Sequence, residues 1–231
     1  MKTLSFLAVI FTSAALSSAS AQTISQWTFE VNTPADATDT NVIAGIAADF
    51  GSGSAMGLHA STASDWTTPA GNGSANSLSV NTWASGDYFQ FRLGTAGYSG
   101  IGVSFDQTSS STGPRDFDLR YSLDGSSFTT LASYAVLQNG LAPNAGWSAG
   151  TYQSAYTFNF DLSAITALNN ATDVYFRLVN TSTLTPSGGT VAAGGTDRVD
   201  NFTVYVVPEP TGLAALGGLL LLAGRKFAQR R

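Results

Sequence analysis

An alternation of apolar and polar residues with a period of two runs through most of this chain and restricts it to half-buried β-strands. In the segment Asp87–Leu93, one face carries Phe89, Phe91 and Leu93, and the opposite face carries Tyr88, Gln90 and Arg92. The same alternation recurs at residues 101–106, 117–123, 156–162, 174–178 and 202–206. Helical periodicity is nearly absent. Strands of this kind belong to antiparallel sheets with one face on a core and one in water.

The turn between two of these segments extends the pattern to a fold class. Asp124-Gly125 is typical of a tight hairpin, so we expect strands at 118–123 and 127–134 to pair. With a first strand at Ile24–Val31, the chain has about eight strands, which is enough for two packed sheets. The sequence therefore predicts an all-β antiparallel β-sandwich of jelly-roll type, with one short helical turn at Leu162–Leu168.

Two segments lack clean alternation and are predicted to be long loops, Asn32–Ala84 and Gln138–Gln153. Trp66, Trp83 and Trp147 lie in or beside them and are candidate ligand-binding residues, because exposed indoles stack on sugar rings. The alternative is that the same indoles plug the ends of the sandwich. The general tendency of tryptophan to be largely buried favours the plug.

The charge composition excludes several classes of function. Between residues 22 and 206 the chain has five arginines, no lysine and fourteen acidic residues. Nucleic-acid binding needs clustered lysine and arginine, so we expect no DNA or RNA partner. The absence of cysteine excludes disulfides, thiolate metal sites and cysteine nucleophiles.

Residues 1–21 have the three parts of a secretory signal peptide. Lys2 precedes the apolar segment Leu4–Leu16, and small residues follow, with Ala19 and Ala21 forming an A-x-A cleavage site. A buried N-terminal helix is the alternative, which the basic start, the short apolar segment and the small-residue end together disfavour. We therefore expect an exported protein whose mature chain begins at Gln22.

Residues 207–231 show a second three-part pattern: a motif, an apolar segment and a basic tail. The motif is Val207, Pro208, Glu209 and Pro210, and the tail carries Arg225, Lys226, Arg230 and Arg231. Between them, Thr211–Gly224 is uncharged and would span about 21 Å as a helix, against roughly 30 Å for a hydrocarbon core. Snorkelling of the flanking basic side chains would extend this transmembrane helix. The positive-inside rule keeps the tail cytoplasmic and the body outside. The alternative of a core helix is disfavoured by the prolines before it and the basic residues after it.

This C-terminal end closely resembles the PEP-CTERM sorting signal of exported bacterial proteins, which has a Val-Pro-Glu-Pro motif, a Leu/Gly-rich transmembrane segment and an Arg-rich tail. The resemblance covers residues 207–231 only. It implies an exosortase, a membrane-embedded processing enzyme, as a partner. It further implies removal of the tail and delivery to the cell envelope or extracellular matrix, often alongside exopolysaccharide production.

Residues 85–206 resemble the galactose-binding-like jelly-roll modules appended to secreted bacterial proteins and enzymes. The resemblance rests on the Asp124-Gly125 hairpin, the segment DVYFRLVN and the closing strand that begins Arg198-Val199-Asp200-Asn201. It implies a carbohydrate-binding or adhesive module, with a glycan as partner, more readily than a catalyst.

No catalytic residue is predicted. His59 is the only histidine, and no H-E-x-x-H motif occurs, so we interpret His59 as a solvated or packing residue. Glycoside hydrolysis needs two carboxylates beside the scissile bond. Glu30 is the only glutamate of the body, and its aspartates stand where turns and polar strand faces place them. Asp116 and Asp118 beside Arg120 are interpreted as solvated charges.

A metal site is predicted at one position. Asp200 is in phase with Phe202 and Val204, so its carboxylate is expected to face the core and to need partners. Arg198 and backbone amides are one possibility, and Ca²⁺, which prefers carboxylate and carbonyl oxygens, is the other. Related jelly rolls often hold a structural Ca²⁺ where first and last strands meet. The hypothesis is a Ca²⁺ shared by Glu30 and Asp200.

Three functional hypotheses follow. The first is an exosortase-processed, non-catalytic binding or structural protein of the surface or exopolysaccharide matrix, anchored at the envelope or extracellular after processing. The second is a secreted polysaccharide-active enzyme, a glycoside hydrolase or lyase. The third is a tail-anchored surface protein whose resemblance to a sorting signal is accidental.

Overall fold

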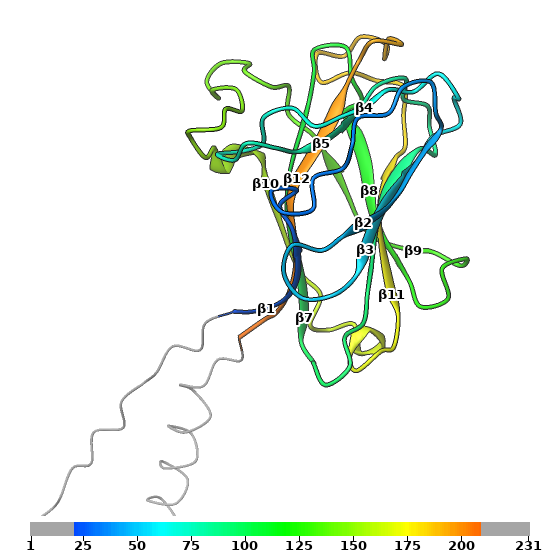
Figure 1. Cartoon of the computed structure of the whole chain (residues 1–231), viewed down its shortest axis with the longest axis vertical. Coiled ribbons are helices and arrows are strands. Elements are labelled where there is room, and N and C mark those ends of the chain that lie inside the picture. Colours follow the sequence, from blue (N-terminus) through cyan, green and yellow to red (C-terminus); the bar gives the residue numbers. More distant parts are fainter. Residues whose placement is uncertain (1–20, 209–231) are drawn as a thin grey trace, which may run out of the picture. The chain divides into compact units, whose positions relative to one another are not determined.

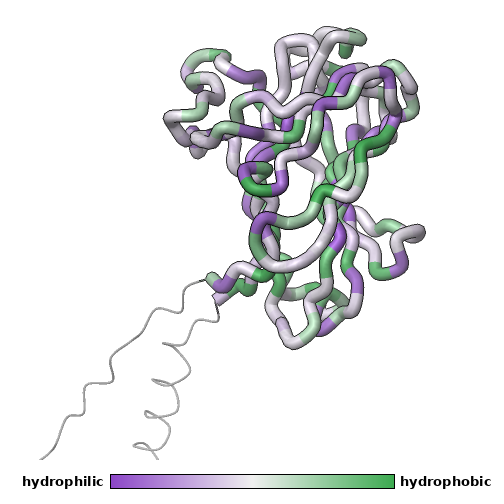
Figure 2. Tube along the Cα trace, viewed as in Figure 1, coloured by the Kyte–Doolittle hydropathy of each residue, from purple (hydrophilic) through white to green (hydrophobic). Residues whose placement is uncertain are grey.

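The segments with the clearest alternation form neighbouring strands of one antiparallel sheet. In the computed structural model, which describes residues 21–208, these are β6 (Tyr88–Leu93), β8 (Asp116–Ser122) and β11 (Val174–Asn180). Their apolar side chains are buried on one face, and hydrophobic and hydrophilic residues follow one another along the strands in Figure 2. A second antiparallel sheet covers the apolar face, which confirms the predicted all-β sandwich (Figure 1).

The described residues contain twelve strands in two six-stranded sheets, rather than about eight strands. Sheet A has the order β10-β7-β12-β5-β4, and β1 also pairs with β12. Its strands are β1 (Gln22–Trp27), β4 (Trp66–Thr67), β5 (Leu78–Val80), β7 (Ile101–Ser109), β10 (Thr157–Asp161) and β12 (Asp197–Val206). Sheet B has the order β2-β3-β6-β11-β8-β9, with β2 (Val42–Ala47), β3 (Ser54–Leu58) and β9 (Thr129–Ala135) completing it.

The hairpin predicted around Asp124-Gly125 is confirmed, with a longer loop than a two-residue turn. Strands β8 and β9 pair antiparallel, and residues 123–128 connect them. The Asp124 carboxylate accepts hydrogen bonds from the amides of Ser126 and Ser127, which lower its pKa. Gly125 has φ +74°, a conformation that glycine adopts without strain.

The prediction that Asn32–Ala84 is a loop was wrong, because β2, β3, β4 and β5 lie in this segment. These strands are short or rich in small residues, and they are fixed by backbone pairing rather than by side-chain pattern. Gly57 in β3 shows why: an added Cβ would lie 2.1 Å from the Trp66 ring, so a strand residue here must lack a side chain.

The second predicted loop, Gln138–Gln153, contains no named strand and leads into the 3₁₀ helix η1 (Ser154–Tyr156). The helical turn expected at Leu162–Leu168 is present only as the shorter 3₁₀ helix η2 (Thr166–Leu168).

The core between the sheets is centred on aromatic side chains from both layers. Phe91 of β6 stacks on Phe202 of β12, with ring centres 3.6 Å apart and an interplanar angle of 3°. The Trp27 ring of β1 packs edge-on against both of these phenylalanines. Because all three side chains are fully buried, this contact joins the first and last strands of the sandwich to the opposite sheet.

A short chain of buried polar side chains crosses the core at another level. The Tyr134 hydroxyl donates to Gln107 Oε1 at 2.7 Å, and Gln107 Nε2 donates to Asp197 Oδ1 at 2.8 Å. Asp197 is completely buried, and its Oδ2 has no hydrogen-bond partner among the described residues. Burial raises the pKa of Asp197 well above its ordinary value, so the folded protein holds this carboxyl in its neutral form.

We predict that Asp197 makes the protein less stable as pH rises. The unfolded chain releases this proton near pH 4 while the folded chain retains it, so the free energy of unfolding falls by up to about 1.4 kcal/mol per pH unit above that point. Asn at this position keeps the bond from Gln107 and has no proton to lose. Thermal unfolding of Asp197→Asn and of the wild type should therefore coincide near pH 4 and diverge toward pH 8, with the variant more stable.

The control is Asp39→Asn, which removes an exposed carboxylate. Its melting temperature should run parallel to that of the wild type over this pH range. Parallel curves for Asp197→Asn would contradict the assignment of a neutral buried carboxyl.

Candidate functional site

The outer face of sheet B, which is the side turned away from the core, collects the polar members of the alternating strands. Its central side chains are Tyr88, Gln90 and Arg92 from β6, Tyr175 and Arg177 from β11, and Asp118 and Arg120 from β8. The pairing register places Arg177 opposite Gln90 on one side and opposite Arg120 on the other. Three of the five arginines found between residues 22 and 206 therefore lie together on this face.

Arg177 occupies the middle of the face and is held on three sides. Its guanidinium carbon lies 3.9 Å from the centre of the Tyr88 ring and 3.7 Å from that of the Phe128 ring. Its Nε donates to Gln90 Oε1 at 2.7 Å. Burial, together with the positive charge of Arg120, lowers the pKa of Arg177, although a guanidinium stays charged at any physiological pH.

The other two arginines of the face are paired with carboxylates. Arg92 Nε donates to Asp173 Oδ1 at 2.8 Å, and Arg120 donates to Asp118 Oδ2 at 2.7 Å. Burial alone would raise the pKa of Asp118, but hydrogen bonds from Ser133 and Arg120 outweigh it and lower the pKa. These carboxylates are therefore ionised partners of neighbouring arginines.

The loop 123–128, which connects β8 and β9, lies beside the face. Gly125 approaches the Tyr175 ring so closely that an added Cβ would lie 3.1 Å from it, and Phe128 covers one side of Arg177. The hairpin that the sequence indicated thus contributes an aromatic side chain to the surface.

A hollow of about 400 Å³ continues the face beyond Tyr88. Its lining consists of Asn41, Leu58, His59, Ala60, Ser85, Gly86, Asp87 and Tyr88. Burial raises the pKa of Asp87, although the amides of Ala84 and Ala60 donate to its carboxylate. The hollow adds the Tyr88 ring, the Asp87 carboxylate and the Asn41 amide to the side chains of the face.

The outer face of sheet B combines aromatic rings with planar guanidinium groups and hydrogen-bonding side chains. Tyrosine rings provide apolar surface with a polar tip, and guanidinium and amide groups donate and accept in fixed directions. Such a surface suits a ligand with apolar ring faces and many hydroxyl or carboxylate groups. Sequence reasoning placed Tyr88, Gln90 and Arg92 on a polar face but did not identify this surface, because the register that joins three strands was not available to it.

The three tryptophans proposed as ligand-binding residues are buried, which corrects that assignment. Trp66 has no exposed surface, and Trp83 and Trp147 are each 7% exposed. Trp66 Nε1 donates to the Thr40 carbonyl and Trp83 Nε1 to the Val80 carbonyl. All three rings are buried, which agrees with the general tendency that favoured the alternative of a plug over ligand binding.

His59 lies between the Trp66 and Trp83 rings, with ring centres 5.0 and 4.3 Å away. Ser64 Oγ and Asp87 Oδ2 are both nearest to the same ring nitrogen, Nδ1, at 3.1 and 3.6 Å. A Ser-His-Asp triad needs the serine and the carboxylate on opposite nitrogens. Burial lowers the pKa of His59 to about 4, and the residue is a packing histidine, as expected.

Asp200 is buried as expected but not toward the core. Asn201 has φ +51° and forms a bulge in β12, which turns Val199 and Phe202 to the same side. Asp200 therefore lies on the outer side of sheet A, opposite Asp106.

The Asp200 carboxylate is held by hydrogen-bond donors rather than by Arg198. It accepts from the amides of Asn72 and Asn201 and from the Ser74 hydroxyl, at 2.9, 2.7 and 2.6 Å. Burial raises its pKa to about 6 against these bonds. Arg198 donates instead to the Ala70 carbonyl. The alternative of backbone amides as partners is thus the one observed.

Glu30 contacts the same loop, because its Oε1 accepts from the Asn76 amide at 2.6 Å. Glu30 and Asp200 thus both bind residues 72–76, with hydrogen-bond donors directed at them. Within the part of the chain that the structure describes, no three His, Asp or Glu side chains form a group that would hold a metal. Hydrogen-bond donors thus already hold the Asp200 carboxylate, and the shared Ca²⁺ is a hypothesis that chelation tests.

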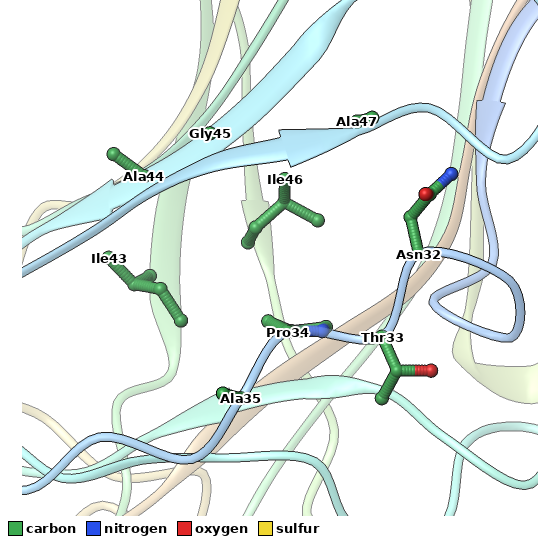
Figure 3. A pocket seen from close by; sticks show the side chains of 9 residues that line it. All are labelled: Asn32, Thr33, Pro34, Ala35, Ile43, Ala44, Gly45, Ile46 and Ala47. Carbon is green, nitrogen blue, oxygen red and sulfur yellow. The ribbon is translucent and has the colours of Figure 1, made fainter.

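A hollow of about 380 Å³ between β2 and residues 32–35 offers little chemistry (Figure 3). Ile43 and Ile46 point from the strand toward Pro34, and no charged side chain lines it. The hollow separates an edge strand from the segment that covers it.

Several predicted features lie outside the described residues. These are the signal peptide apart from Ala21, and everything from Glu209 onward, including the apolar segment and the basic tail. Residues 21–208 include no helix with the length and apolar character needed to cross a membrane.

Comparison with known proteins gives structural likenesses at low identity only. No protein-family model and no curated protein sequence matches the chain. Among solved structures, it is similar to the CBM22-1–GH10 modules of an endo-1,4-β-D-xylanase from Clostridium thermocellum, complexed with xylohexaose. The identity is 14% and the TM-score 0.45, covering 81% of this chain and 29% of that chain.

Two further structures match at a TM-score of 0.41 each. The CBM22-2 xylan-binding domain from Paenibacillus barcinonensis is 12% identical, over 79% of this chain and 98% of that one. The K1 cleaved adhesin domain of Lys-gingipain from Porphyromonas gingivalis is 14% identical, over 79% and 97%. Likenesses at this level do not identify a ligand for this chain.

We predict that chelation leaves the stability of the body, residues 22–207, unchanged. Because three donors already hold the Asp200 carboxylate and the Asn76 amide binds Glu30, removal of divalent ions with EDTA should not shift the melting temperature. A fall of several degrees on chelation, reversed by added Ca²⁺ and absent in Glu30→Gln, would instead establish the shared calcium site.

Proposed function

We propose that this chain is an exported protein with an exosortase sorting signal, whose jelly-roll sandwich binds glycan at the cell surface or in the extracellular matrix without catalysing a reaction. The observation that carries the binding function is the outer face of sheet B. It groups Tyr88, Tyr175 and Phe128 with three arginines on a surface turned to solvent. Sugars present apolar ring faces edged by hydroxyls, which such a surface complements.

The non-catalytic role is supported by how the carboxylates of the face are used. Asp118 and Asp173 each accept from an arginine, which fixes them in place. A glycosidase needs one carboxyl that can donate a proton near neutral pH and a second carboxylate across the bond. Hydrogen bonds lower the pKa of Asp118, and Asp87, whose pKa burial raises, is buried and accepts from two backbone amides.

The sorting function is supported by where the motif stands in the chain. Val207 follows directly on β12, and its amide donates to the Gly100 carbonyl at 2.7 Å. The motif Val207–Pro210 thus begins where the last strand ends. Loss of everything beyond the motif would leave every pairing of β12 in place.

The sorting function predicts a defined mature protein. Intact-mass measurement and C-terminal peptide mapping of the protein from its native host should find a chain that starts at Gln22 and ends near Pro210. Replacement of Pro208, Glu209 and Pro210 by alanine should abolish this processing, whereas an accidental membrane anchor would be indifferent to the change. A native chain that still carries Arg231 would contradict exosortase processing.

The binding function predicts retardation of the body in gels that contain soluble polysaccharide. Tyr88→Ala should weaken the binding about tenfold, since it removes an aromatic surface worth roughly 1 kcal/mol or more. Tyr152→Ala removes an equally large exposed tyrosine from the loop that follows Gln138, and it is the matched control. Unretarded migration of the wild type in every polysaccharide, neutral or acidic, would contradict the proposed function.

A further inference from the structure

We infer that the outer face of sheet B recognises a glycan that carries carboxylates, a polyuronate, and that Arg177 binds the carboxylate. This inference rests on the proposed glycan-binding function and names the class of sugar. Its basis is that the three arginines of the face differ in their partners, as the ion pairs show.

The charges of the face do not balance within the described protein. Arg92 is paired with Asp173 and Arg120 with Asp118. Arg177 has no carboxylate within 4.0 Å among residues 21–208, and its one side-chain hydrogen bond goes to the neutral Gln90. A half-buried guanidinium without a counter-charge is the group on this face that an anionic ligand would complete.

The position of Arg177 opposite Arg120 gives a second reason to expect an anionic ligand. The two arginines are direct neighbours in the register of β11 and β8, and only one carboxylate, Asp118, serves them. Like charges on directly opposed residues repel each other across a sheet. A carboxylate bound to Arg177 would offset that repulsion, whereas a neutral sugar would leave it.

The contacts of Arg177 limit what a ligand can use. The Tyr88 and Phe128 rings both lie against the guanidinium carbon, at 3.9 and 3.7 Å, and the bond from Nε to Gln90 fixes its rotation. Two protein rings thus already take stacking positions that a sugar ring could use. The terminal nitrogens donate no hydrogen bond within the described residues, and they are the donors left for a ligand.

A guanidinium binds a carboxylate through two parallel hydrogen bonds in its plane. Because the aromatic rings and Gln90 already hold the group, little side-chain freedom is lost on binding. A guanidinium also binds tetrahedral oxyanions through two oxygens, so a sulfated polymer is the comparison that tests the assignment to a carboxylate.

The experiment uses the body, residues 22–207, which forms one compact unit that contains the whole described core. Its affinity is measured by retardation in gels containing polygalacturonic acid, carrageenan or neutral galactan. Polygalacturonic acid should bind most tightly. Arg177→Gln should weaken that binding at least about tenfold, the usual scale for loss of a charged hydrogen-bonded pair, and should weaken galactan binding by a smaller factor.

Two further variants separate charge from geometry. Arg115→Gln removes the same charge from an arginine that is not one of the three on this face and is paired with Asp116, and it should change polygalacturonate binding less than twofold. Arg177→Lys keeps the charge without the planar fork, and it should lose most of the preference. Thermal unfolding of each variant identifies those that fold, and Arg177→Lys serves the test if Arg177→Gln does not fold.

Several outcomes would overturn the inference. Equal binding of galactan and polygalacturonic acid, or an unchanged preference in a folded Arg177 variant, would remove the carboxylate specificity and leave the glycan-binding function standing. Tighter binding of carrageenan would assign the position to sulfate esters. Absence of binding to all three polymers would overturn the proposed function as well.

Discussion

The pairing of β12 on both of its edges is the constraint on which the sandwich depends. This strand pairs with β7 along its length, while its other edge pairs with β5 near Asp197 and with β1 from Phe202 to Val206. Phe202, in its middle, stacks on Phe91 of the opposite sheet. The central strand of sheet A is therefore the last strand of the chain, and the core closes only after residue 206 has joined. Because these pairings join residues far apart in the sequence, the sandwich can form only when all of its strands are present.

This order has a consequence for the proposed export. Because β1 needs β12 as a partner, the sandwich cannot complete its fold while residues 197–206 are still to be synthesised or translocated. Under the proposed function, the chain would cross the membrane unfolded and fold on the far side. The proposed sorting motif, which begins at Val207, would become available at the same stage.

The sequence predicted those strands in which apolar and polar residues alternate, and it missed those that are fixed by pairing with a distant part of the chain. Alternation identified β6, β8 and β11, together with the polar side chains that make the candidate face. It failed for β3, where Gly57 leaves space for Trp66, and at Asp200, where the positive φ of Asn201 inverts the phase of the strand. The role of Arg177 depends on the pairing of β11 with both β6 and β8 and on Phe128 from the loop 123–128. No local sequence pattern contains this information.

An acidic body and an acidic ligand are compatible because the charges of this protein are unevenly placed. Asp87, Asp106, Asp197 and Asp200 are buried, and burial raises the pKa of Asp197 and of Asp200, the latter to about 6. At physiological salt a charge is screened over about 8 Å, so carboxylates elsewhere on the surface hardly act at Arg177. What decides binding is then the local guanidinium, fixed in direction by two rings. A single such position would bind weakly, but the proposed polymer ligand repeats its carboxylate, and many copies of the protein on a surface would add avidity.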